Sequence, residues 1–413
     1  MKTMRFLIML LALSLSMGAM CQTATQAKSK QTKTVTKNQA SKKSKSKGIV
    51  KFVLYGTEMQ VHFDASKRVK VKYGENNKVA ECIEWINSVT YETLNDCLKL
   101  KEEYNLCDWA YVKMLDKLSS ASLGKTNEAT VMMTVLLNRS GYETCLAWSE
   151  AKKQLMMLYT SDATIYNSNY FKVDSKSYYA YGVVDSTDID LFPKMLEGKP
   201  LSMRINGAQN FAEKLSKPRT LTSAKNPDFS FTVQVNKNLI DFYGDMPSFS
   251  YDDNFMTRWT TMANCQLEKR LQETLIQQMK QKLAGKSQCE QVQELLWWVQ
   301  QAFEYEYDEN VWGSDRAFYA EETLFYPYCD TEDRSILLSR LVRDVVGLDV
   351  LFIYYPGHTA IAVCITDDAI EGAYVVYQGR HFVVCDPTYI GASVGEEMPS
   401  MDVKKKTVML LER

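Results

Sequence analysis

The sequence has few of the residues that metal sites require, since only three of its 413 residues are histidine. Its ten cysteines include no C-x-x-C pair and form no His/Cys cluster at metal-ligand spacing. No run of 18 uninterrupted apolar residues occurs, so we expect no membrane-spanning helix. A basic stripe interleaved with aromatic residues is also missing, which argues against nucleic-acid binding. We therefore expect no metal, no organic cofactor and no nucleic acid.

The first 21 residues have the pattern of a secretory signal peptide. A charged start precedes an apolar run at residues 6–15, which is too short to span a bilayer. Small residues follow, and cleavage after Gly18 or after Cys21 fits them. Lipidation of Cys21 is the alternative, although Met20 is larger than the residue expected before a lipoprotein cysteine. The pattern predicts an exported protein that is periplasmic, secreted or associated with the cell surface.

Residues 22–48 contain eight lysines and no acidic residue. Such a segment cannot bury enough apolar surface to offset its ordering entropy, so we predict a disordered tether. It is either a solvated spacer or a contact for anionic lipid or a cell-envelope polymer. The remaining body carries 39 basic and 50 acidic side chains and is therefore net negative.

Hydrophobic periodicity in this body predicts an α+β fold in which helices precede antiparallel strands. Helical spacing extends from Val79 to about Leu118, and "NEATVMMTVLLNRSG" predicts a helix that ends at Gly141. "YFKVDSKSYYAYG" (170–182) alternates as a hairpin. In the C-terminal third, a helix ending at Gly347 precedes four strands.

The two halves can be aligned helix on helix and hairpin on hairpin, which suggests an internal duplication. A chance likeness between two common helix-and-hairpin units is the alternative. We expect an N-terminal α+β domain at residues 49–185, which would be the degenerate copy. A β-rich connector is expected at 186–264 and the second copy at 265–413.

The chemistry-bearing residues gather in the second copy. "FYPYCDTEDRSILLSRLV" (325–342) predicts a loop that opens into a helix. His358 follows Pro-Gly and opens a strand, and Asp386 ends a strand before Pro387. A nucleophile at a helix start, a histidine base and an orienting carboxylate together form an acyl-transfer relay. The helix N-terminus would lower the pKa of a thiol there and stabilise an oxyanion.

"DTEDRSILLSRLV", "YYPGHTAIAV" and "VVCDPTYIGASVGEEMP" resemble the transglutaminase-like superfamily, whose papain-like fold carries a Cys-His-Asp triad. The resemblance covers about residues 288–400. It implies that His358 is the base and that Asp386 orients it. Members usually read D-C-E-D-R at the nucleophile, but this sequence reads D-T-E-D-R, with Thr331 at that position.

Three interpretations of the nucleophile remain open. Thr331 is a helix N-cap and the copy is catalytically inactive, or Cys329 acts from a shifted turn, or Thr331 itself reacts. An inactive copy would be a pseudoenzyme that binds a protein or peptide in a cleft without turnover. An active copy would be an amidase, peptidase or acyl transferase that uses Cys329, His358 and Asp386 on glutamine or peptide amides.

Overall fold

The computed structural model describes residues 48–64, 66–182, 189–192, 197–205, 207–252, 254, 256–367, 370–399, 401 and 405–413. The predicted signal peptide, Cys21 and all but the last residue of the predicted tether lie outside the described residues. Residues 46–413 belong to one compact unit, and the domain boundaries predicted within them stay predictions.

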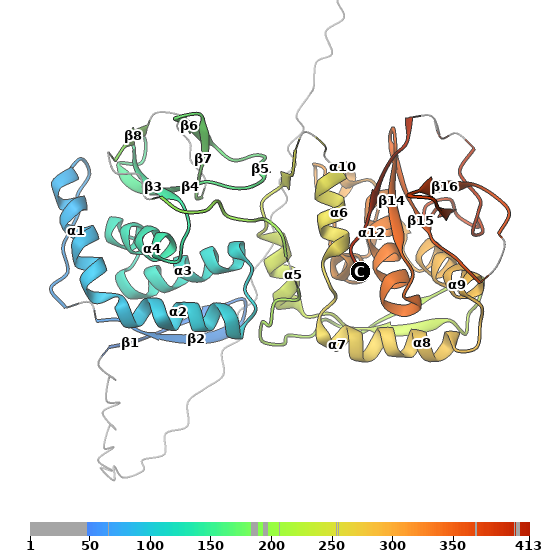
Figure 1. Ribbon diagram of the computed structural model, residues 1–413. Coiled ribbons are helices and arrows are strands. Elements are labelled where there is room, and N and C mark those ends of the chain that lie inside the picture. Colours follow the sequence, from blue (N-terminus) through green and yellow to red (C-terminus); the bar gives the residue numbers. More distant parts are fainter. Residues whose placement is uncertain are drawn as a thin grey trace, which may run out of the picture. The chain divides into compact units, whose positions relative to one another are not determined.

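Two five-stranded sheets organise this unit, one in each half of the chain (Figure 1). The first contains β3 (Thr144–Ser149), β4 (Gln154–Tyr159), β6 (Tyr170–Val173), β7 (Lys176–Ala180) and β8 (Ile189–Leu191). The second contains β14 (Val350–Tyr355), β15 (His358–Val363), β16 (Tyr374–Tyr377), β17 (Arg380–Cys385) and β18 (Thr407–Leu410). All neighbouring strands in both sheets are antiparallel.

The two sheets have the same strand order, β6-β7-β4-β3-β8 in the first and β16-β17-β15-β14-β18 in the second. Counted along the chain, both orders are third, fourth, second, first and fifth strand. Their faces match as well. Cys145 and Ala147 lie on the face of the first sheet away from the main core, as Leu351 and Ile353 do at the same positions of the second. This agreement supports the predicted duplication.

Helices cover the core face of each sheet. In the first half they are α1 (Asn76–Val89), α2 (Tyr91–Glu103), α3 (Asp108–Leu123) and α4 (Asn127–Arg139). The helical spacing predicted from Val79 to Leu118 thus belongs to three helices, separated at Thr90 and again at residues 104–107. Between α2 and α3, Asn105 adopts a left-handed backbone conformation with a φ of 50°. In Figure 1 α3 and α4 lie side by side, and α4 packs against β3 and β4.

The remaining elements up to Asn264 lie outside the two five-stranded sheets. They are β1 (Ile49–Leu54) and β2 (Thr57–His62) at the start, then β5 (Thr164–Ile165), β9 (Arg219–Thr222), β10 (Ser230–Val233), α5 (Lys237–Gly244), β11 (Phe249–Ser250) and α6 (Met256–Asn264). The predicted connector therefore contains two helices besides its short strands.

The second half adds α7 (Lys269–Leu271), η1 (Gln272–Ile276), α8 (Gln277–Leu283), α9 (Gln288–Gln301), β12 (Glu304–Tyr305), α10 (Asp308–Val311), α11 (Ala320–Phe325), β13 (Tyr328–Cys329), α12 (Thr331–Leu341) and η2 (Val342–Val346). The α12–η2 helix ends at Gly347, as predicted, with a left-handed backbone that suits glycine. The α+β class is confirmed. Among the described residues, no helix has the length and apolar character that a membrane crossing needs.

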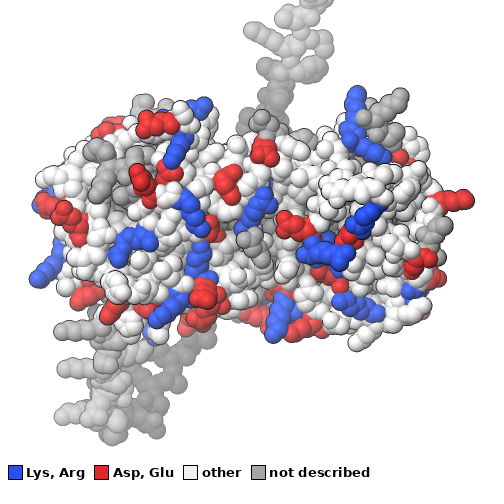
Figure 2. Space-filling view, in the orientation of Figure 1, with Lys and Arg blue, Asp and Glu red and all other residues white. Residues whose placement is uncertain are grey.

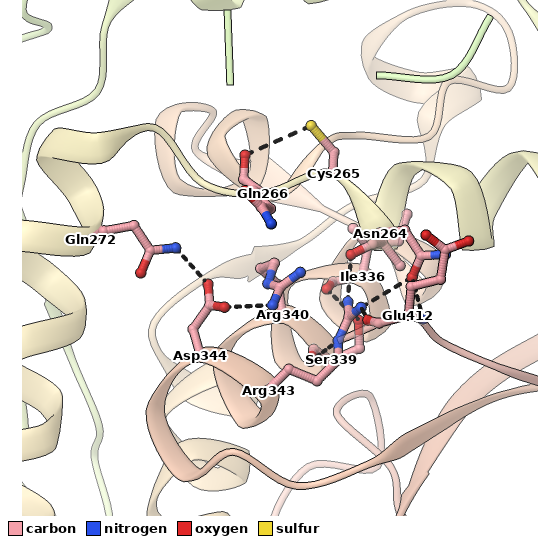
Figure 3. A network of polar contacts seen from close by, with 11 residues as sticks. Asn264, Cys265, Gln266, Gln272, Ile336, Ser339, Arg340, Arg343, Asp344 and Glu412 are labelled. Atoms are coloured by element: carbon pink, nitrogen blue, oxygen red, sulfur yellow. Dashed lines mark hydrogen bonds and ion pairs between the residues drawn. The ribbon is translucent and has the colours of Figure 1, made fainter. Parts of the chain in front are cut away.

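A polar network holds the C-terminal end of α12 and the adjoining η2 (Figure 3). Arg343 donates to the Asn264 side chain at 3.0 Å and to the backbone oxygen of Glu412, and Arg340 pairs with Asp344. Burial and the charge of Arg340 lower the pKa of Arg343 to about 9. Because α12 is anchored at this end, its N-terminus has a defined position beside the second sheet.

Candidate functional site

The start of α12 is capped by Asp330, one residue earlier than the sequence suggested. Asp330 is the N-cap residue, and its backbone N–H donates to Asp333 Oδ2 at 3.2 Å. Thr331 is the first helical residue and not the N-cap, which corrects our expectation. Its hydroxyl donates to Glu332 Oε2 at 3.1 Å. The Thr331 hydroxyl therefore bonds to a carboxyl group and not to a histidine base.

Cys329 lies in β13, where it pairs with Tyr305 of β12, and is 3% exposed. The Arg334 Nε–H donates to its sulfur at 3.4 Å, and the thiol donates to the Glu304 carbonyl at 3.7 Å. Burial raises the pKa of the Cys329 thiol to about 12, although Arg334 acts in the opposite direction. At neutral pH this cysteine is a protonated, packed side chain. Among the described residues, the nine cysteines are thiols and not disulfides.

His358 and Asp386 form the partnership that the sequence predicted. The distance between His358 Nε2 and Asp386 Oδ2 is 2.8 Å, and both residues are buried, with exposures of 5% and 1%. A carboxylate only accepts hydrogen bonds, so the tautomer that suits this contact has its proton on Nε2 and leaves Nδ1 as the nitrogen that could act as a base. The arrangement supplies an oriented imidazole.

Asp386 is held by its own loop. Its Oδ1 accepts from the Thr388 backbone N–H at 2.9 Å, the Thr388 hydroxyl at 3.1 Å and the Tyr389 N–H at 3.1 Å. Gln300, at the end of α9, donates through Nε2 to the carbonyls of Asp386 and Tyr389, both at 3.0 Å. Three hydrogen bonds to the carboxylate and two to the backbone carbonyls of its loop keep Asp386 in place for His358.

The α12 helix meets β15 at the residue next to His358. Ser335, one turn after Thr331, is 3.2 Å from the Thr359 hydroxyl. Side chains alternate between the two faces of a sheet along each strand. His358 therefore lies on the same face as Ala360 and Ala362, and Thr359 lies on the opposite face. Among the described residues, no hydrogen bond joins His358 to Thr331 or Cys329. The structure thus brings together two of the four predicted site residues.

Acidic side chains surround the helix start. The carboxyl oxygens of Asp308, Asp330 and Glu332 lie within 4.8 Å of one another. Burial and the nearby carboxyl groups raise the pKa of Asp308 to about 6 and of Asp330 to about 9. Burial likewise raises the pKa of Glu332 and, with Asp330 nearby, that of Asp333. Ionised carboxylates so close together repel one another. A hard cation bound by the three oxygens would remove this repulsion, and so would protonation of the carboxyl groups.

The first sheet offers none of this chemistry at the matching positions. By strand register, Gln154 opens β4 where His358 opens β15, and Gly182 corresponds to Asp386. Asn127 is the first residue of α4. Its side-chain amide donates to Val71 O at 3.0 Å and accepts from Leu155 N at 2.9 Å, so it connects the start of the helix to two neighbouring backbone segments. The first half therefore has no histidine, aspartate or nucleophile at the three positions that match Thr331, His358 and Asp386.

Sequence reasoning missed two buried residues that tie the site together, Arg334 and Gln300. Arg334 is 1% exposed and donates to Gln300 O at 3.2 Å and to Phe303 O at 2.8 Å. Gln300 could have been noticed as a polar residue at the end of an otherwise apolar helix stripe. Arg334 belongs to the D-T-E-D-R motif itself.

We compared the chain with known protein families, with curated proteins and with solved structures, and none of the three comparisons gave a match.

Proposed function

We propose that the protein is an exported, transglutaminase-like pseudoenzyme that binds glutamine- or peptide-amide groups without turning them over. One observation carries the proposal: His358 and Asp386 keep the geometry of a base and its orienting carboxylate, while neither candidate nucleophile is activated. Export rests on the signal-peptide pattern, and the papain-like assignment rests on the sequence motifs.

The state of the candidate nucleophiles favours binding over catalysis. Thiol chemistry needs the thiolate, and a pKa of about 12 leaves Cys329 protonated at neutral pH. The Thr331 hydroxyl is a weaker nucleophile still, and its hydrogen-bond partner is a buried carboxyl group whose pKa is raised. An amide that reaches the start of α12 would meet backbone N–H donors but no activated nucleophile.

The proposal is tested by restoring the missing thiol. With iodoacetamide between pH 5 and 9, we expect Cys329 of the wild type to react at least ~100-fold more slowly than glutathione at neutral pH, because its thiolate fraction is so small. We expect Thr331→Cys to be labelled rapidly at residue 331. A glutamine-containing peptide should slow that labelling, because it occupies the same site. Mass spectrometry assigns the modified residue.

The double variant Thr331→Cys, His358→Ala is the matched control. It keeps the introduced thiol and removes the imidazole, so its labelling should fall back towards that of an ordinary surface thiol. Rapid labelling of Cys329 in the wild type that is lost in Cys329→Ala and depends on His358 would overturn the proposal in favour of an active thiol enzyme. Failure of the peptide to protect the introduced thiol would contradict ligand binding at this site.

A further inference from the structure

A cleft of about 940 Å³ lies in the first half of the chain, where the starts of α4 and β4 meet. Asn127 and Gln154 line it, and these residues occupy the places of Thr331 and His358 in the second half. Tyr181, next to the counterpart of Asp386, lines it too. The cleft is therefore the first copy's equivalent of the candidate site, and its lining has a different chemistry.

Basic side chains outnumber acidic ones in the lining of this cleft by six to two. Its six basic residues are Arg68, Lys70, Lys72, Lys117, Lys125 and Lys152. They come from three separate stretches of sequence that only the fold brings together. We call this set the basic cleft.

Internal partners neutralise only part of this charge. Arg68 pairs with Glu128 at 2.9 Å, and the other acidic residue of the lining, Asp116, accepts from the Tyr181 hydroxyl at 3.2 Å. Four lysines form no ion pair with any described residue, namely Lys70, Lys72, Lys117 and Lys125. With six basic and two acidic side chains, the lining of the basic cleft has a positive surplus.

This surplus contrasts with the rest of the protein. The body beyond the tether carries more acidic than basic residues, and positive and negative side chains are interspersed over the face seen in Figure 2. Positive charge gathered in a concave, low-dielectric site attracts anions more strongly than the same charge spread over a convex surface. For the attraction of an anion, the grouping of these lysines around one cleft therefore matters more than the number of lysines in the chain.

One buried hydroxyl in the lining also has no partner. Ser119 is 2% exposed, lies on α3, and its Oγ forms no hydrogen bond with any described residue. Buried hydroxyl groups are nearly always hydrogen-bonded. An oxygen of a ligand in the cleft would provide the missing partner, directly or through water.

From these observations we propose that the basic cleft binds a small ligand with several oxyanion groups, either phosphates or carboxylates. The lysines provide the charge and Ser119 a neutral hydrogen bond. The proposal is independent of the function proposed for the second half, since it uses none of the same residues.

The test is calorimetric binding of tripolyphosphate and, separately, of a hexaglutamate peptide to the full chain at 50 and 300 mM NaCl. Neutralising three of the unpaired lysines, in the variant Lys70→Gln, Lys117→Gln, Lys125→Gln, should weaken binding about 10- to 100-fold at low salt. Binding by the wild type should weaken as salt rises. If only tripolyphosphate binds, the cleft prefers phosphate groups. If both probes bind, the cleft accepts carboxylates as well as phosphates.

A matched variant carries the same charge change away from the cleft, at Lys214, Lys217 and Lys280, which are exposed and do not line it. It should bind within about twofold of the wild type. The predicted tether is present in all three proteins and cannot cause a difference between them. Equal loss in both triple variants, or no binding of either probe to the wild type, would overturn the proposal.

Discussion

Replacing Arg334 by alanine should lower the free energy of unfolding by about 3–5 kcal/mol, because it breaks a buried set of charge-assisted hydrogen bonds. The guanidinium donates to the carbonyls of Gln300 and Phe303 and to the sulfur of Cys329, and it stacks over the Tyr305 ring at 5.4 Å. Without it, two buried carbonyls at the end of α9 lose their donors. Urea denaturation of the purified full chain measures the loss.

Arg334→Lys is the companion variant, since an ammonium group cannot reproduce the planar fork that reaches three acceptors. It should lose about half as much stability as the alanine variant, and it remains measurable if the alanine variant does not fold. Arg380→Ala serves as the control, because its ion pair with Asp349 lies at the surface and should contribute no more than about 1 kcal/mol. If both Arg334 variants lost less than about 1 kcal/mol of unfolding free energy, water or other groups would have to replace the hydrogen bonds of Arg334, and the prediction would be wrong.

Asp330→Asn should stabilise the protein at alkaline pH. A carboxyl group whose folded-state pKa lies above its unfolded value binds more protons in the folded state. Its contribution to stability is therefore complete below the unfolded pKa of about 4 and is lost as the pH rises towards the folded value of about 9. Asparagine caps a helix as well as aspartate does and carries no charge. We expect a gain of about 2–4 kcal/mol at pH 8 and less than about 1 kcal/mol at pH 4.5.

Thermal and urea denaturation at the two pH values measure this difference, with Asp241→Asn as the control. Asp241 is exposed on α5, and its replacement should change stability by no more than about 0.5 kcal/mol at either pH. Calcium and magnesium form a second arm. If either cation stabilised the wild type at pH 8 but not Asp330→Asn, a bound cation rather than protons would neutralise Asp308, Asp330 and Glu332, and our explanation would be wrong.

The central strands β14 and β15 could be predicted from sequence, because they are nearly continuous apolar runs and the Pro356-Gly357 turn separates them. The central strand β4 was not predicted, since no glycine or proline marks the turn before it. The edge strands β8 and β18 could not, because each is only three or four residues long and pairs with a strand far back in the chain. The partnership of His358 and Asp386 was predictable because the turn before His358 and Pro387 after Asp386 mark the ends of their strands.

The surroundings of the site were less predictable because they depend on tertiary contacts. Nothing in the local sequence indicates that Arg334 would reach Gln300, 34 residues away, or that Asp308 would approach Glu332. The pKa of Cys329 likewise follows from its burial in β13 and not from its position near a helix start. Local sequence patterns were sufficient to locate the candidate site residues, but the protonation of Cys329 depends on burial that only the fold produces.

Gln300 has a consequence for how this region opens. Its side chain holds the loop that carries Asp386, and its carbonyl accepts from Arg334, which also holds Phe303 and Cys329. Local opening of any one of these segments would leave buried donors or acceptors of the others unpaired. The amides of residues 303–305, 329–334 and 386–392 should therefore exchange with solvent deuterium as one cooperative group, with a shared opening free energy.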